Sequence, residues 1–172
     1  MSPEPTARLD ARFSDAGVDP TPWRDAERVL EGAELYWLST VRADGRPHVT
    51  PLVGAAVGGA MHFCTGLSEQ KARNLEHNER VALTTGSNTW AEGLDVVLEG
   101  TAVRVTDEDA LQAIADAYEE KYGSVWHFDV GDGVFRAGEL AAAVFRIDPD
   151  KAIAFAKDPH AHTTYRFGAV RD

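Results

Sequence analysis

The segment that decides the fold reads Phe63-Cys64-Thr65-Gly66-Leu67-Ser68-Glu69-Gln70-Lys71-Ala72-Arg73-Asn74-Leu75. Its first part has the composition of a β-strand, Gly66 marks a turn, and a short helix is expected to follow Ser68 as its N-cap. Lys71 then falls at the third helical position, where a Glu or Gln normally complements the helix dipole. A lysine is unfavourable there unless an anion lies beside it. The segment therefore predicts a corner between strand and helix that attracts negative charge.

Two interpretations of this corner are open. Free backbone N–H groups, the hydroxyls of Thr65 and Ser68 and the Lys71 ammonium would together form a phosphate-binding site. Alternatively, Lys71 points into solvent and Glu69 offsets its charge. Asn74 lies one helical turn further on, so its side chain is expected to reach either the same ligand or the backbone.

The chain around this corner is dominated by strand patterns. Alternating apolar residues, with many aromatic and β-branched types, predict strands over 34–41, 46–53, 61–65, 81–85, 94–105, 142–147, 151–157 and 163–167. This number of antiparallel strands favours a closed or nearly closed barrel, because closure hides the sheet edges. The fold class expected is mainly β, α+β, with short helices flanking the barrel.

The segments between the strands predict three helices and two irregular links. Helices are expected to begin near Pro22, Ser68 and Thr106, where capping residues precede apolar residues at helical spacing. Residues 124–140 contain three glycines among charges and aromatics, which predicts an irregular excursion. Asp148-Pro149-Asp150 is expected to be a tight link between two strands.

Length and composition indicate a single domain. The 172 residues are 44% hydrophobic, which is enough for one core. Residues 1–20 carry three prolines among charged and small residues, so we expect an N-terminal arm that is flexible or draped over a partner, and poorly ordered unless docked, followed by one domain over 21–172. The 28 acidic residues against 17 basic ones give a net charge of -11. This excess argues against a nucleic-acid or anionic-membrane partner.

Cysteine usage and hydropathy point to the cytoplasm. Cys64 is the one cysteine, so the chain has no internal disulfide and no cysteine cluster for a metal. Within a predicted strand, its thiol is expected to be buried and inert. No stretch approaches the roughly 18 apolar residues of a membrane span. His160 and His162 would share one face of a strand, but no metal site is predicted because further ligands are missing nearby.

Several short motifs occur in a specific order and spacing. They are Leu38-Ser39-Thr40-Val41, Asp44-Gly45-Arg46-Pro47, His48-Val49-Thr50-Pro51-Leu52, Phe63-Cys64-Thr65, Lys71-Ala72-Arg73-Asn74-Leu75, Val97-Leu98-Glu99-Gly100 and Thr164-Tyr165-Arg166-Phe167. With them the chain resembles, from about residue 34 to residue 167, the FMN-binding split-barrel proteins related to pyridoxamine 5'-phosphate oxidase. The resemblance implies an antiparallel split β-barrel that forms a homodimer with the cofactor at the subunit interface.

The resemblance also implies a set of cofactor-binding residues. In this family the Thr after the third strand and the Lys of the next helix hold the phosphate, and the second strand runs along the flavin ring. The residues implied here are Val49, Thr50, Pro51, Leu52, Thr65, Gly66, Ser68, Lys71 and Asn74. Pro51 suits this arrangement because a proline cannot donate a ladder hydrogen bond and so belongs at a sheet edge or bulge. Trp90, in a predicted loop, is expected either to stack on the ring or to pack in the dimer interface.

The function implied is that of an oxidoreductase in which FMN or the deazaflavin coenzyme (F-420) transfers a hydride to or from a small organic substrate. No catalytic side chain is identified, since the cofactor performs the redox step. Val49 and Gln70 stand where the vitamin-forming oxidases have arginines, which argues against pyridoxamine phosphate oxidation. The helix motif and the Tyr-Arg-Phe ending are more similar to the branch that uses the deazaflavin, some of which uses FMN. The alternative is a non-catalytic cofactor carrier or a haem-binding protein on the same barrel.

Overall fold

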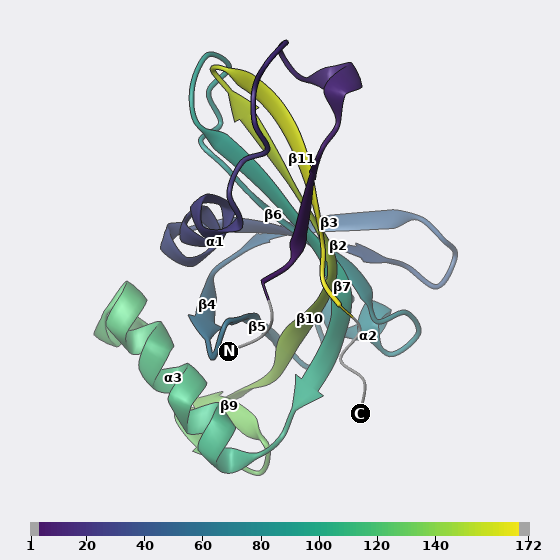
Figure 1. Ribbon diagram of the computed structural model, residues 1–172. Helices are drawn as coiled ribbons and strands as arrows, with labels where there is room; N and C mark the ends of the chain where they lie inside the picture. Colours follow the sequence, from purple (N-terminus) through teal and green to yellow (C-terminus); the bar gives the residue numbers. More distant parts are fainter. Residues whose placement is uncertain (1–3, 169–172) are drawn as a thin grey trace.

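Eleven strands form a single sheet in the computed structural model, which describes residues 4–168 (Figure 1). The strands are β1 (Thr6–Leu9), β2 (Tyr36–Val41), β3 (Pro47–Leu52), β4 (Gly54–Val57), β5 (Ala60–Gly66), β6 (Arg80–Thr85), β7 (Leu94–Val105), β8 (Asp129–Gly131), β9 (Val134–Ala137), β10 (Leu140–Lys157) and β11 (His160–Arg166). The helices are α1 (Trp23–Gly32), α2 (Gln70–Leu75) and α3 (Glu108–Tyr122), with 3-10 turns η1 (Ala11–Phe13) and η2 (Ser124–Trp126). The predicted mainly β split barrel with flanking helices is confirmed.

The strand order is β1-β11-β10-β7-β6-β2-β3, and all pairings are antiparallel. β5 and β9 pair with β10, and β4 and β8 join the sheet through β5 and β9 respectively. β3 therefore ends one side of the main sheet, and β10 connects most of the strands. β5 pairs with the first half of β10. Gly66, at the end of β5, therefore lies opposite Ala142, near the start of β10.

β10 is one continuous strand of 18 residues, so the tight link predicted at residues 148–150 is wrong. The register against β7 shifts between Pro149 and Lys151, which makes a β-bulge. A bulge accommodates the proline, which cannot donate a ladder hydrogen bond, without ending the strand. Gly100 lies opposite, where a Cβ atom would collide with the carbonyl oxygen of Asp148.

The N-terminal segment is docked on the sheet from residue 6 onward. β1 pairs with β11, and the backbone N–H groups of Asp10 and Asp15 donate to the carbonyl oxygens of His162 and His160, each at 2.8 Å. Figure 1 shows this segment running beside β11. This part of the arm predicted over 1–20 is therefore docked on its own sheet, where pairing with an edge strand satisfies its backbone groups. Residues 1–3 of that arm lie outside the described residues.

The helices begin one residue later than their sequence signals predict. α2 has Glu69 as its N-cap residue in place of Ser68, and no side chain caps it. α3 is capped by Asp107 in place of Thr106, with Asp107 Oδ1 accepting from the Ala110 N–H at 2.9 Å. α1 begins at Trp23 after Pro22. Each start lies close to the predicted position.

Residues 124–140 fold into η2 and the hairpin β8–β9, so the irregular excursion predicted there is wrong. Asp132 and Gly133 both have positive φ, 55° and 69°, which is the geometry of a two-residue hairpin turn. The Asp132-Gly133 pair, between Gly131 and Val134, is the sequence signal for this turn. The hairpin pairs with the first residues of β10.

Two hydrophobic clusters stabilise the barrel. The first packs α1 against the sheet and includes Tyr36, Leu38 and Phe63. The second packs α3 against β4, β9 and β10 and includes Tyr118 and Phe135. Figure 1 shows α3 beside β4 and β9, at the end of the barrel away from β11. Within residues 4–168, no helix is long and apolar enough to cross a membrane.

Candidate functional site

A cavity of about 510 Å³ lies where β3, the corner from β5 to α2 and the segment from η2 to β10 meet. This volume is within the range of about 300–1,000 Å³ that is typical of small-molecule sites. The lining residues are Pro51, Leu52, Val53, Cys64, Thr65, Gly66, Ser68, Glu69, Lys71, Trp126, Phe128, Phe135, Ala137, Leu140, Ala141 and Ala142. The cavity therefore joins the charged corner predicted from sequence to a second wall that was not predicted.

The polar wall of the cavity consists of Thr65, Gly66, Ser68, Glu69 and Lys71. Lys71 is only 8% exposed, so the expectation that its side chain points into solvent is wrong. The Glu69 carboxylate lies over the corner: Oε1 accepts from the Gly66 N–H at 2.8 Å, and Oε2 forms an ion pair with Lys71 Nζ. Glu69 thus offsets the lysine charge, as the second interpretation held. The anion beside Lys71 is a side chain of the protein.

Glu69 is the more exposed partner of this ion pair. Its side chain is 50% exposed, against 10% for the Lys71 side chain. Partial burial raises the pKa of Glu69, but the hydrogen bonds from Lys71 and from the Gly66 N–H outweigh it and hold the pKa below its usual value. Glu69 is therefore ionised at neutral pH, and the corner holds one positive and one negative charge.

The aromatic wall of the cavity consists of Trp126, Phe128 and Phe135. Phe128 and Phe135 stack with ring centroids 4.7 Å apart, and Trp126 lies edge-on to Phe128 at 6.1 Å. Behind them Tyr118 of α3 contacts Phe135 edge-on at 6.0 Å and donates to the Val53 carbonyl oxygen at 3.2 Å. Rings fixed in this way offer a preformed apolar surface to a flat ligand.

The sequence prediction did not include the aromatic wall. Its members come from η2, from the link to β8 and from β9, which meet only because of the β8–β9 hairpin. The available signal was the pattern of Trp126 and Phe128 before the Asp132-Gly133 turn and Phe135 after it. Reading that turn as a hairpin would have placed Phe135 on a strand returning toward Phe128.

The residues predicted on the second strand divide into two groups. Pro51 and Leu52 line the cavity, whereas Val49 and Thr50 are outside its lining. Val49 is 53% exposed, on the same face of β3 as Pro51. The Thr50 hydroxyl is buried and has no hydrogen-bond partner among residues 4–168. An unsatisfied buried hydroxyl costs about 1–3 kcal/mol, so it marks a place where a ligand could add a hydrogen bond.

Asn74 lies outside the cavity lining, and both of its side-chain polar atoms have partners. Nδ2 donates to Thr40 Oγ1 at 2.8 Å, and Oδ1 accepts from Gln70 Nε2 at 2.8 Å. The side chain reaches neither a ligand site nor the backbone, the two options expected from helical spacing. It ties α2 to β2, which is a structural function.

Cys64 lines the cavity as a partly buried residue. Burial raises the pKa of its thiol to about 11. The thiol is therefore protonated at neutral pH, in agreement with the inert thiol predicted from the sequence.

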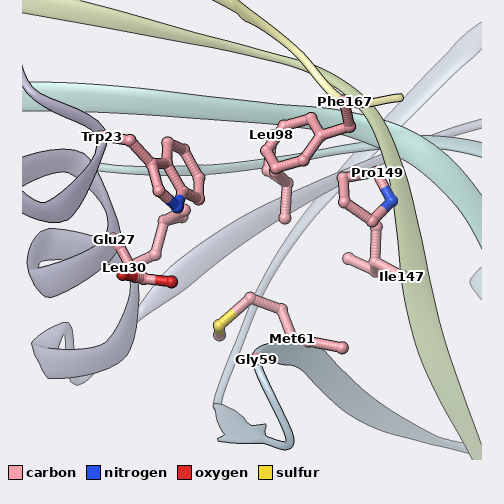
Figure 2. A pocket seen from close by; sticks show the side chains of 10 residues that line it. Trp23, Glu27, Leu30, Gly59, Met61, Leu98, Ile147, Pro149 and Phe167 are labelled. Atoms are coloured by element: carbon pink, nitrogen blue, oxygen red, sulfur yellow. The ribbon is translucent and has the colours of Figure 1, made fainter. Parts of the chain in front are cut away.

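A second cavity, of about 30 Å³, lies between α1 and the sheet (Figure 2). Figure 2 shows Trp23 and Leu30 on one side of this gap and Met61, Ile147 and Pro149 on the other. The volume is about that of one water molecule, so this cavity is a packing gap and not a site for a planar ligand.

Metal ligands do not gather in the described part of the chain. No group of three or more His, Cys, Asp and Glu residues within 4–168 has the geometry to hold a metal ion. The ring of His162 packs against that of Phe155 in a tilted arrangement with centroids 4.7 Å apart, and His160 is exposed at the start of β11.

Fold and site together define a split barrel with a ligand-sized cavity that has a charged wall and an aromatic wall. The family profile of the pyridoxamine 5'-phosphate oxidases matches residues 23–155, and the chain belongs to this family. The match includes both walls of the cavity. No curated protein matches the chain in sequence.

Solved structures share the fold at low sequence identity. A heme binding protein from Mycobacterium smegmatis is 19% identical with a TM-score of 0.69, over 86% of this chain and 59% of that protein, so the chain spans less than two thirds of its length. A conserved hypothetical protein from Mycobacterium tuberculosis is 20% identical with a TM-score of 0.66, over 85% and 91% of the two chains. An FAD binding protein from Mycobacterium smegmatis is 16% identical with a TM-score of 0.58, over 78% and 95%.

Proposed function

We propose that the protein is a flavin- or deazaflavin-dependent oxidoreductase that transfers a hydride to or from a small organic substrate. The observation that carries the proposal is the cavity of about 510 Å³, whose lining includes both a buried lysine and an aromatic wall. FMN and the deazaflavin coenzyme both combine a phosphate with a planar tricyclic ring. Membership of the pyridoxamine 5'-phosphate oxidase family supports a cofactor of this class.

The residues present fit such a cofactor. Lys71, Thr65 and Ser68 would hold the phosphate at the polar wall, which carries one ammonium and two hydroxyls. Pro51 and Leu52 would lie along the ring, and the aromatic wall would shield it from water.

The bound cofactor would supply the hydride chemistry, while the chain supplies binding, orientation and exclusion of water. Lys71 is held in place by burial, so its charge is presented in a fixed position. Cys64, although it lines the cavity, stays protonated because of its raised pKa and takes no part as a nucleophile.

A homodimer with the cofactor between two subunits is part of the proposal. Leu35, Trp37 and Val49 are each about half exposed, and Trp37 pairs with Pro51 across β2 and β3. An apolar surface at a sheet edge, continuous with the cavity through Pro51, favours coverage by a second copy. Trp90 is 93% exposed and would pack in the same interface or on the ring. Light scattering should give twice the monomer mass of 18.7 kDa.

The rival function is that of a haem-binding protein or a cofactor carrier without turnover. The fold is shared with a heme binding protein. However, the cavity lining given by the described residues contains no histidine, and Cys64 is its one soft ligand. This favours a flavin over haem. Absorption spectra of the purified protein mixed in turn with FMN, the deazaflavin and haem separate the three, and a bound flavin without turnover by any reductant would indicate a carrier.

The cofactor orientation is tested by comparing FMN with riboflavin, which lacks the phosphate. Lys71→Met keeps the aliphatic stem and removes the charge, so FMN affinity should fall by about 1.5–3 kcal/mol, or roughly 10- to 150-fold, whereas riboflavin affinity should hardly change. Arg73→Met, at an exposed position of the same helix, is the matched control and should leave both affinities as they are. Equal losses for FMN and riboflavin would contradict the assignment of the phosphate to Lys71.

A further inference from the structure

We infer that the Glu69 carboxylate is an internal competitor of the ligand's phosphate, which must displace it from Lys71 and from the Gly66 N–H before the site can be filled. This inference rests on the proposed function and deepens it, because it adds a residue that sets how tightly a phosphate is accepted. Its basis is the position of the carboxylate within the polar wall.

The two Glu69 oxygens occupy two donors that a phosphate would need. Oε1 accepts a hydrogen bond from the Gly66 N–H at 2.8 Å, and Oε2 accepts one from the Lys71 ammonium. A phosphate that entered the site while Glu69 holds this position would be repelled by the carboxylate. It would also find both donors already occupied. Glu69 also approaches Gly66 so closely that a Cβ atom built there would lie 3.0 Å from Oε1. The carboxylate therefore sits in the place of a ligand anion.

The ion pair is asymmetric in a way that permits exchange. The Lys71 side chain is 10% exposed and fixed, whereas the Glu69 side chain is 50% exposed and can turn into solvent. Although Glu69 is the N-cap residue of α2, its side chain makes no capping hydrogen bond. Its rotation therefore leaves the helix start intact. The buried ammonium would then need another anion, which a phosphate provides.

This arrangement predicts that neutralising Glu69 has opposite effects on stability and on binding. Glu69→Gln keeps an oxygen for the Gly66 N–H but removes the charge that pairs with Lys71. The protein without ligand should lose stability, because a buried ammonium is left without its counter-ion. Phosphate should bind more tightly, because no carboxylate competes for the ammonium. A purely structural glutamate would lower stability without raising affinity.

The experiment compares the wild type, Glu69→Gln and the control Glu76→Gln, an exposed carboxylate at the other end of α2. FMN affinity should rise about tenfold for Glu69→Gln, with riboflavin affinity unchanged, while the midpoint of thermal unfolding without ligand should fall. Glu76→Gln should behave as the wild type in all three measurements. Unchanged or weaker FMN binding by Glu69→Gln overturns the inference even if the wild type binds FMN.

Inorganic phosphate separates this inference from the proposed function. Without any flavin, added phosphate should raise the thermal midpoint of Glu69→Gln by more than that of the wild type or of Glu76→Gln. If no variant binds a flavin but this difference is seen, the proposed function is wrong and the competition stands. Equal phosphate effects in all three proteins overturn the competition independently of any cofactor.

Discussion

The polar and aromatic walls face the same cavity but are built by different means. The polar wall depends on one ion pair between residues two positions apart, at a corner where β5 passes into α2. The aromatic wall depends on rings from η2, the β8–β9 hairpin and α3, packed in one buried cluster. A charged corner can exchange its anion without unfolding, whereas a packed ring cannot leave without creating a void. The comparison predicts ligand-dependent change at the polar wall and rigidity at the aromatic wall.

The largest effect should come from removing a ring of the aromatic wall. Phe135→Ala deletes a fully buried side chain that contacts Tyr118 and Phe128, so the free energy of unfolding should fall by about 3–5 kcal/mol. Urea denaturation measures this loss. Val125→Ala, at an exposed residue of η2, is the control and should stay within about 0.5 kcal/mol of the wild type. A small loss for Phe135→Ala would mean that this wall is not rigid.

An intermediate effect is expected beneath the polar wall. Asn74→Ala leaves the buried Thr40 hydroxyl without its 2.8 Å donor, which should cost about 1–3 kcal/mol of unfolding free energy. FMN affinity should not change, since Asn74 lies outside the cavity lining. Arg73→Ala, at the exposed neighbouring position, is the matched control. A loss of FMN affinity without a loss of stability would show that Asn74 contacts the ligand, and the assignment of a purely structural function to this residue would be wrong.

The smallest effect concerns the exposed pair that ties η2 to α3. His127, which follows η2, donates from Nδ1 to Glu119 Oε2 at 2.6 Å, and this hydrogen bond, together with the charge of the carboxylate, raises the pKa of His127 above its usual 6.5. Because the folded pKa is the higher one, the pair contributes fully below pH 6.5 and its contribution disappears as the pH rises through the folded pKa. Exposure keeps the contribution small.

Thermal unfolding of the wild type and of His127→Gln from pH 5.5 to 8.5 measures this pair. The wild type should be the more stable protein at the acidic end, and the two should converge at the alkaline end. A difference that grows toward alkaline pH would show that His127 supports the aromatic wall in its neutral form.

Local sequence patterns predicted the strands well where the pattern and the pairing partner were both clear. β7 begins and ends where its apolar run does, at Leu94 and Val105. The prediction failed where distant parts of the chain decide the outcome. Pro149 signals a turn locally, but β7 offers a glycine opposite and the strand continues as a bulge. Likewise the N-terminal residues gain their order from β11, which no local signal reveals.

In the candidate site, too, the residues that are close in sequence were predicted, and those brought together by distant segments were not. Thr65, Ser68 and Lys71 follow one another closely, so helix-start electrostatics were enough to bring them together. The helix begins one residue later than expected, with Glu69 as its N-cap residue, and the Glu69 carboxylate pairs with Lys71. Propensities could not decide between Ser68 and Glu69, because the choice depends on the contact of the carboxylate with Gly66. The aromatic wall required knowledge of a hairpin and was missed entirely.

The length of β10 affects how the protein unfolds. This strand supplies Val144 to the cluster under α3 and Ile147, Ala152 and Ala154 to the cluster under α1. Neither cluster can open while the other keeps its part of the same strand in place, so the barrel should melt in one cooperative step. The ladder-bonded backbone amides of β10 on both sides of the bulge at Pro149 should then exchange with deuterium at one common, slowest rate, set by global opening of the chain.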